Sequence, residues 1–448
     1  MPQSPSAASR DEPVIRDRGD ACPGALRLHA ADDGFLARVR IPGGMLDGSA
    51  ARMLADAADR LGDGHLDLTS RGNVQLRGLG ESCGGELAEL LAGAGLLPAP
   101  THERVRNIVS SPLAGLDRLG LPDVSPWVAE LDALLCASDA AAGLSGRFLF
   151  ALDDGRGDVT SLAADVNLVP EGDDRARLWA GDPREAVLVP SQDAPRAALT
   201  AAAYFLDAVR QAGTRAWRVA ELPPEHALSG ARLVERLADA GVPAAVAAPD
   251  PSARSAPSAR SARSVTTPEP GIVPGTDGTA SLSVLAPLGR LTTAQWRRLA
   301  GLTGRVRLTP WRGIVVPGLP GHAAAGALAG LAEAGLVTTA DSPWRSVTAC
   351  TGKPGCAKAL ADVRADAQAV MERARGPLAV HWSGCERRCG HPRGSAWVDL
   401  VATPAGYDLH VEGRAPRHGV PEHELAPALA EARHADHVRH NLPDSVQK

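Results

Sequence analysis

Four cysteines near the C-terminus are the residues best suited to carry chemistry in this chain. They form two pairs, within TACTGKPGC and SGCERRCGHP: Cys350 and Cys356, then Cys385 and Cys389. Five residues separate the first pair, three separate the second, and 28 lie between the pairs. Four thiolates gathered from two loops are the usual protein ligands of an iron–sulfur cluster. Zinc sites also use four cysteines, but their pairs are typically about two to four residues apart. The wide first loop therefore favours a cluster over zinc.

The elements around these loops indicate how they are held. The segment Cys356–Ala374 has apolar residues on one face and predicts a helix whose positive N-terminus would favour an anionic cluster. Gly376 and Pro377 end this helix. The apolar run Leu378–Trp382 predicts a strand that leads into the second cysteine loop.

Composition limits the class of protein. The chain has 448 residues, enough for about two to four packed units. Its first 20 residues are polar and charged, so we expect neither a signal peptide nor a membrane-spanning helix there. Seven cysteines without a secretory segment favour a reducing compartment, and we expect a cytoplasmic protein. A net charge of −5 excludes a globally basic nucleic-acid binder.

An internal repeat organises the chain. The segment Leu66–Leu79 reads LDLTSRGNVQLRGL, and 240 residues later Val306–Leu319 reads VRLTPWRGIVVPGL. The same offset aligns AGLL at 94–97 with AGLV at 334–337, which indicates a duplicated module. It also aligns Ser110 with Cys350, so only the second copy has the cysteines.

Each copy has the pattern of an α+β unit. Alternating apolar residues predict strands, and Ala/Leu-rich runs predict helices. In the first copy the expected order is a strand at 34–41, a helix at 48–61, strands at 65–68 and 74–76, and a helix at 86–94. In the second copy a helix is expected at 323–334. Gly95 and Gly335 follow the last helix of each copy, where a left-handed residue is favoured. The segment RFLFALDDG at 147–155 predicts a strand that ends in an acidic turn.

These residues resemble the nitrite/sulfite reductase superfamily. The C-x5-C and C-x3-C pairs match its cluster motif, and TSRGNVQLRG, VRNIVSSP and LSGRFLFALDDG resemble its tetrapyrrole-site segments. The resemblance implies two ferredoxin-like half-domains and two larger α/β domains related by a pseudo-twofold axis. The expected division is a disordered tail at 1–20, a half-domain at 21–100, a tetrapyrrole-site domain at 101–248, a flexible linker at 249–274, a half-domain at 275–340 and a cluster domain at 341–440.

Within the superfamily, the chain looks most like the precorrin-3B synthases of cobalamin biosynthesis. Reductases typically read GCPN-x-C at the second pair, whereas Glu386 and two arginines separate the cysteines here. Where sulfite reductases place a K-F-K run facing the anion, this chain has Arg147-Phe148-Leu149, with leucine in place of the second cation. Two alternatives remain: a sirohaem-dependent nitrite or sulfite reductase, and a non-catalytic protein that holds a tetrapyrrole.

The resemblance implies an oxygen-dependent monooxygenase that hydroxylates precorrin-3A at C20 with closure of a γ-lactone. It implies a [4Fe-4S] cluster for electron delivery, a mononuclear non-haem iron, and NADH as electron source, through a partner reductase or a site that the sequence does not reveal. Sirohaem is not expected. His381 and His391 flank the second cysteine pair, but packing or hydrogen-bonding roles are favoured for them, and the iron is not assigned.

Arginines are the expected substrate contacts, because precorrins carry many carboxylates and arginine binds a carboxylate through two parallel hydrogen bonds. Arg71, Arg106 and Arg147 lie in the three segments that match the tetrapyrrole site, and Arg77 lies in the same hairpin as Arg71. The other cysteines are isolated and are expected to be inert: Cys22, Cys83 and Cys136.

Overall fold

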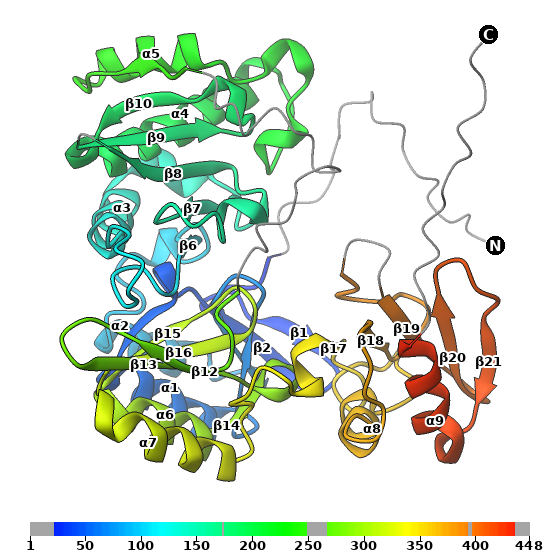
Figure 1. Ribbon diagram of the computed structural model, residues 1–448. Helices are drawn as coiled ribbons and strands as arrows, with labels where there is room; N and C mark the ends of the chain where they lie inside the picture. Colours follow the sequence, from blue (N-terminus) through cyan, green and yellow to red (C-terminus); the bar gives the residue numbers. More distant parts are fainter. Residues whose placement is uncertain (1–21, 173, 249–266, 393–396, 435–448) are drawn as a thin grey trace, which may run out of the picture.

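A computed structural model describes residues 22–172, 174–248, 267–392 and 397–434. The expected tail at 1–20 and most of the expected linker, 249–266, lie outside the described residues. The described chain forms four β-sheets with helices packed on them, in the arrangement seen in Figure 1. The α+β class predicted from the sequence is therefore confirmed.

The two half-domain sheets exchange a strand. The first sheet has the order β1 (His29–Ala31), β2 (Gly34–Val39), β5 (Val74–Leu79), β4 (His65–Leu68) and β14 (Arg290–Thr292). The second has the order β12 (Gly271–Pro274), β13 (Thr279–Leu285), β16 (Gly313–Pro320), β15 (Arg305–Leu308) and β3 (Met45–Asp47). The last strand of each sheet comes from the other copy and pairs antiparallel with its neighbour. The two half-domains therefore fold as one body.

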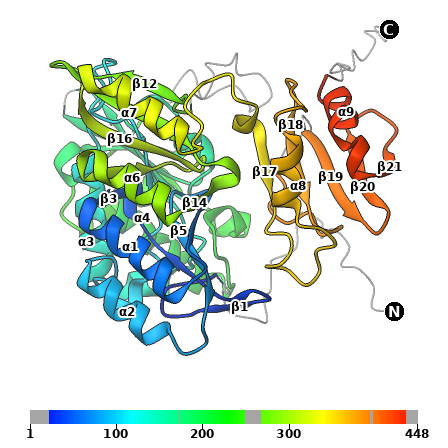
Figure 2. The same cartoon turned by 90° about the horizontal axis from the view of Figure 1, so that it is seen from below.

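A shared core confirms that union. Four helices contribute to it: α1 (Gly48–Leu61), α2 (Gly84–Gly93), α6 (Thr293–Thr303) and α7 (Gly321–Glu333). The indole of Trp296 in α6 is 1% exposed and donates to the carbonyl of Ala51 in α1 at 2.7 Å. Helices α1, α6 and α7 cover the face of the paired sheets seen from below in Figure 2. Burying this apolar surface from both copies is what stabilises the pair.

Each copy also has an outer domain with the same strand plan. The first outer domain (residues 101–248) holds the sheet β11 (Ala245–Val246), β10 (Val187–Pro190), β9 (Arg175–Ala180), β8 (Val166–Glu171), β7 (Phe150–Leu152) and β6 (Ile108–Ser110), with helices α3 (Ser125–Ala137), α4 (Ala194–Gln211) and α5 (Gly230–Asp239). The second outer domain (residues 341–434) holds β17 (Val347–Ala349), β18 (Ala379–Ser383), β19 (Trp397–Thr403), β20 (Gly406–Val411) and β21 (Arg417–Val420), with α8 (Val363–Val370) and α9 (Glu422–Arg433). Both sheets start with three parallel strands and continue antiparallel. The duplication therefore extends to the outer domains.

Left-handed turn positions follow the same symmetry. Gly95 and Gly335 have φ of 70° and 82° after the last helix of each half-domain, as the sequence predicts. The hairpin turn between β4 and β5 has Gly72 at φ 65°, and its counterpart in the second copy is Arg312 at φ 60°. Glycine accepts this conformation without strain, whereas arginine does not. The second copy therefore keeps the turn at a conformational cost.

Three sequence predictions need correction. The expected helix Cys356–Ala374 is wrong, since only Val363–Val370 is helical and the side chain of Asp362 caps it. Backbone groups before Asp362 bond between the two loops instead, with Leu360 N to Gly384 O at 2.7 Å. The strand expected at 147–155 is shorter in the structure, where only β7 (Phe150–Leu152) is extended and paired. The second half-domain begins before residue 275, because β12 is its edge strand.

The helices of the described chain can be compared with the length and hydropathy that a membrane span needs. None of the helices in the described part of the chain combines the length and the apolar character that a bilayer span requires.

Candidate functional site: two cysteine loops and an arginine cluster

The two cysteine loops leave the same end of two neighbouring strands. Strands β17 and β18 are parallel, and their carboxyl ends lead into the loops that carry Cys350 and Cys385. The amide of Cys350 donates to the carbonyl of Trp382 at 2.9 Å, and the amide of Gly384 donates to the Cys350 sulfur at 3.1 Å. A Cβ at Gly384 would lie 2.7 Å from the Cβ of Ala359. Only glycine therefore lets the loops approach this closely.

The four thiols are the right chemical groups to bind an iron–sulfur cluster, but their positions only partly match those of a ligand set. All four cysteines are free thiols, with Cys389 exposed and the other three half-buried. Burial raises the pKa of the Cys350 thiol, and the neighbouring thiols of Cys389 and Cys385 raise it further. Both thiols therefore lie within electrostatic range of the Cys350 sulfur. Among the described residues, however, no three His, Cys, Asp or Glu side chains converge well enough to hold a metal ion. The four-cysteine ligand set remains a prediction.

The flanking histidines do not form a ligand set in the described chain. His381 is fully buried on β18, and its Nδ1 lies 2.8 Å from the hydroxyl of Thr348. Burial and the nearby His391 ring lower the pKa of His381 to about 4, so the imidazole is neutral. The two rings meet edge to face with centroids 5.2 Å apart. This geometry agrees with the packing and hydrogen-bonding roles expected for both residues.

Arg71 lies in a cationic cluster built around one carbonyl. It projects from the turn between β4 and β5, and its guanidinium donates to the carbonyls of Gly146 at 3.3 Å and Arg147 at 3.1 Å. Arg40, which follows β2 and is 3% exposed, also donates to Gly146 O at 3.4 Å, as does Asn107 at 3.2 Å. In the part of the chain that is described, neither Arg40 nor Arg71 forms an ion pair with a carboxylate. A carbonyl cannot neutralise two guanidinium charges, so this cluster can accept an anion.

The electrostatics of Arg71 support the same conclusion. Burial lowers the pKa of Arg71 to about 10, and the charges of Arg218 and Arg40 lower it further. The folded protein therefore holds the Arg71 charge at a cost that a bound carboxylate would offset. The neighbouring Arg218 does have a carboxylate partner, Asp165 at 2.5 Å.

Arg147 completes the cluster on the solvent side. Its guanidinium carbon lies 4.7 Å from the centroid of the Trp217 ring. The neighbouring Leu149, which replaces the second cation of the reductase motif, is 3% exposed and packs with Val109 and Trp311 in a small apolar cluster. We refer to Arg40, Arg71, Arg147 and Arg218 as the arginine cluster. Sequence reasoning missed Arg40 and Arg218; the only local sign for Arg40 is an arginine that follows an otherwise buried strand.

The other two predicted substrate contacts have structural partners. Arg77 makes a bidentate pair with Asp33, both contacts at 2.8 Å, and donates to Gly355 O at 3.1 Å. It therefore ties the first cysteine loop to the first half-domain. Arg106 makes a bidentate pair with Asp132 of α3, both contacts at 2.7 Å, and is 4% exposed. Its charge is already neutralised, which contradicts the expected role in the substrate pocket.

The Arg106–Asp132 pair predicts a loss of stability. Replacing Arg106 with leucine leaves Asp132 unpaired in a mostly buried position and lowers the free energy of unfolding by about 3 kcal/mol. Urea unfolding measures this change, and the double variant Arg106→Leu/Asp132→Leu should recover part of it. A single variant with unchanged stability and weakened substrate binding would restore Arg106 to the pocket.

A cavity of about 490 Å³ lies beside the first cysteine loop rather than at the arginine cluster. Residues of β14, of the loop and of the start of α8 line it, among them Arg290, Lys353 and Arg364. Arg290 pairs with Asp63 at 2.7 Å, and Arg364 pairs with Asp67 at 3.0 Å. Most of the positive charge that lines the cavity is therefore neutralised, unlike that of the arginine cluster.

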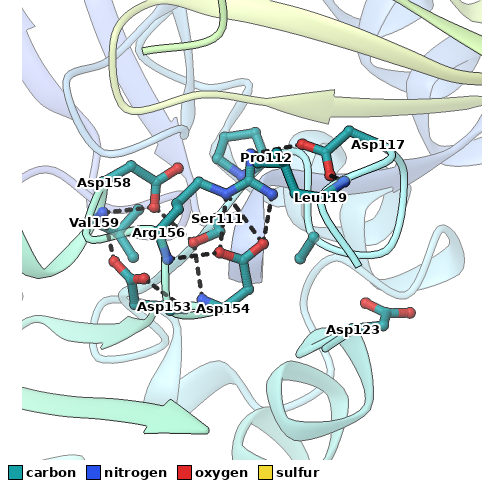
Figure 3. A network of polar contacts seen from close by, with 12 residues as sticks. Ser111, Pro112, Asp117, Leu119, Asp123, Asp153, Asp154, Arg156, Asp158 and Val159 are labelled. Carbon is teal, nitrogen blue, oxygen red and sulfur yellow. Dashed lines mark hydrogen bonds and ion pairs between the residues drawn. The ribbon is translucent and has the colours of Figure 1, made fainter. Parts of the chain in front are cut away.

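The first outer domain replaces the cysteine loops with an acidic network. Strand register makes Ser111 the counterpart of Cys350, because each follows its strand and donates its amide to the neighbouring strand, to Leu152 O at 3.1 Å and Trp382 O at 2.9 Å. The ungapped 240-residue offset had assigned Ser110. Figure 3 shows the network, in which Ser111 Oγ donates to Asp158 at 2.6 Å and accepts from the Asp154 amide at 3.1 Å. This half therefore cannot hold a second thiolate cluster.

Asp158 of this network predicts a pH-dependent stability. Its pKa is raised to about 7, chiefly by burial and also by the Asp153 and Asp154 carboxylates, against the lowering effects of Ser111 and Arg156. An unfolded aspartate titrates near 3.9, so the folded state holds the extra proton between about pH 4 and pH 7. Stability therefore falls as pH rises through this window, by an amount on the order of 4 kcal/mol. Asp158→Asn should remove that fall, giving a higher melting temperature than wild type at pH 8 and a similar one at pH 5. If the melting temperatures of the two proteins changed equally between pH 5 and pH 8, the prediction would be wrong.

Comparison with known proteins agrees with this architecture. The family model described as nitrite/sulfite reductase ferredoxin-like half domain matches residues 28–93 and 273–334. A precorrin-3B synthase from Sinorhizobium sp. is 28% identical over 440 residues, which cover 93% of this chain and 88% of that protein. A ferredoxin–nitrite reductase from Synechococcus elongatus is 29% identical over 396 residues, which cover 80% of this chain and 74% of that protein. The solved structure of Mycobacterium tuberculosis NirA superposes with a TM-score of 0.63 at 20% identity. The match covers 88% of this chain and 79% of the NirA chain.

Proposed function

Because the chain belongs to the nitrite/sulfite reductase superfamily, we propose that it is a precorrin-3B synthase, an oxidoreductase that hydroxylates precorrin-3A at C20 with molecular oxygen. Identity alone does not separate this activity from nitrite reduction, since the two relatives are 28% and 29% identical. The choice depends on the residues around the arginine cluster. The cluster is the single observation that carries the proposal.

The arginine cluster suits a macrocycle with many carboxylates better than a small anion. Arg40 and Arg71 converge on one carbonyl without a carboxylate partner in the described chain, and Arg147 extends the charge toward solvent. The guanidinium groups of Arg71 and Arg147 can each bind a different carboxylate, and the buried Arg40 beside Arg71 adds positive charge. Leu149 is buried away from this surface, so the second cation of a sulfite site is missing there. The arginines would bind and orient precorrin-3A.

The reaction balances with one oxygen molecule and a nicotinamide donor. One oxygen atom enters the macrocycle as the C20 hydroxyl, a neighbouring acetate side chain closes the γ-lactone, and the other oxygen atom leaves as water. NADH supplies two electrons and one proton for that water, and solvent supplies the second proton. A [4Fe-4S] cluster on Cys350, Cys356, Cys385 and Cys389 would supply electron transfer when bound, with the Gly384 amide donating to a ligand sulfur. Arg77 would hold that loop against the first half-domain.

The described residues present no ligand set for a separate iron, so no step of oxygen activation is assigned to them. The alternative function is a sirohaem-dependent reductase of nitrite or sulfite, which the similarity to nitrite reductases favours. That enzyme would contain the same cluster motif together with a resident tetrapyrrole.

Spectroscopy of protein purified without oxygen separates these functions. Absorption and EPR spectra are recorded, and iron, sulfide and zinc are counted. Broad thiolate-to-iron absorption with equal iron and sulfide, and no porphyrinoid bands, is expected for the oxygenase. Sharp sirohaem bands would identify a nitrite or sulfite reductase instead. Zinc without sulfide would contradict both.

A further inference from the structure

Trp217 lies where it can control the direction of Arg147. The Arg147 guanidinium carbon lies over the face of the indole ring, 4.7 Å from its centroid. In the part of the chain that is described, the guanidinium forms no ion pair or hydrogen bond, whereas the backbone amide donates to Ser145 Oγ. A guanidinium that stacks through its flat face keeps its N–H donors free in the plane. The ring therefore holds the group without occupying the edges that bind a carboxylate.

The segment that carries Trp217 is fixed to the turn before β7 that carries Arg147. Asp165, 2% exposed, accepts from the amide of Leu149 at 2.9 Å and from the amide of Val219 at 2.7 Å. The same carboxylate pairs with the side chain of Arg218 at 2.5 Å. One buried aspartate thus joins residues 147–149 to residues 217–219. The relative position of the Arg147 and Trp217 side chains is set by this joint.

We propose that Trp217 is a positioning residue, whose ring holds the Arg147 guanidinium edge-on toward a carboxylate of a tetrapyrrole bound at the arginine cluster. This inference rests on the proposed function for the class of ligand. It adds the segment 215–218 as a wall of the binding site. Trp217 itself need not contact the macrocycle.

A double-mutant cycle tests the proposal. The probe is precorrin-3A, kept anaerobic and without an electron donor so that only binding is measured, with the dissociation constant read from the absorption of the macrocycle. Arg147→Ala should weaken binding about tenfold, the value of one charge-assisted hydrogen bond. Trp217→Leu should weaken it about three- to fivefold in the wild-type background, as expected for a lost cation–π contact. In the Arg147→Ala background the same change should have no further effect, because the ring then has nothing to position.

Two controls separate positioning from folding. Trp217→Phe keeps an aromatic face and should bind within about twofold of wild type. Arg236 forms a similar stack on Tyr204 at 4.5 Å in the same domain, so Arg236→Ala should leave binding unchanged. Melting temperatures show whether each variant is folded.

The possible results separate a failure of the proposed function from a failure of the role of Trp217. If wild type does not bind precorrin-3A, both the proposed function and the role of Trp217 are wrong. If Arg147→Ala weakens binding but Trp217→Leu does not, the substrate site stands and the positioning role is wrong. Additive losses in the double variant would also overturn it, since they would mean that the two residues act independently.

Discussion

Replacing Cys385 with serine is expected to remove the cluster and to abolish turnover of precorrin-3A. Cys385 lies in the loop that follows β18, and its thiol is near that of Cys350. A serine hydroxyl is not ionised at neutral pH and is a poor ligand for iron, so the ligand set loses a thiolate. Iron and sulfide analysis of the purified variant measures the loss directly, and turnover is then assayed on the same sample.

The matched control for this variant is Cys83→Ser. Cys83 precedes α2, packs against the half-domain core and donates to the Gly80 carbonyl at 3.1 Å, far along the chain from either cysteine loop. This control should keep both its iron and its activity. A Cys385→Ser protein with full iron, full sulfide and wild-type turnover would refute the cluster assignment.

Arg71→Met should weaken binding of precorrin-3A by about ten- to a hundredfold without destabilising the free protein. The lost interaction is a charge-assisted hydrogen bond in a mostly buried site. Stability should be retained because the Arg71 charge is already unfavourable in the fold, as its lowered pKa indicates. Methionine fills a similar volume and removes the repulsion from Arg40 and Arg218.

Two measurements decide this prediction: the dissociation constant of anaerobic precorrin-3A and the melting temperature of the ligand-free protein. Arg60→Met is the control, since Arg60 is an exposed residue of α1 paired with Glu86. It should change neither quantity. An Arg71→Met protein that melts well below wild type and still binds precorrin-3A normally would assign Arg71 a structural role.

The sequence could predict features that depend on local pattern. The spacing of the cysteines located both loops, and the 240-residue repeat located the duplicated half-domains. The bounds expected for helix α1, 48–61, match the observed ones because the periodicity of its apolar residues is a local signal. Arg71 and Arg147 come from two of the segments that resemble the tetrapyrrole site, and the Arg71 guanidinium donates to the Arg147 carbonyl; their contact with a substrate stays a prediction.

Features that depend on distant partners could not be predicted. The exchanged strands β3 and β14 have three residues each, too few to show a periodic pattern. The partner of Arg106 lies 26 residues away on α3, and nothing near Arg106 in the sequence indicates that its charge is neutralised. Likewise, Arg218 joins the arginine cluster from a loop after α4. The helix at Cys356 failed for the same reason, because its backbone bonds to the other cysteine loop.

The most direct test of the central claim is turnover of precorrin-3A under isotopically labelled dioxygen. Iron-replete protein is supplied with NADH and a reductase that can pass electrons to it, and the product is analysed by mass spectrometry. The account predicts one labelled oxygen atom in the macrocycle, at C20, and no comparable consumption of nitrite or sulfite under the same electron supply. An unlabelled macrocycle together with rapid reduction of nitrite or sulfite would contradict it.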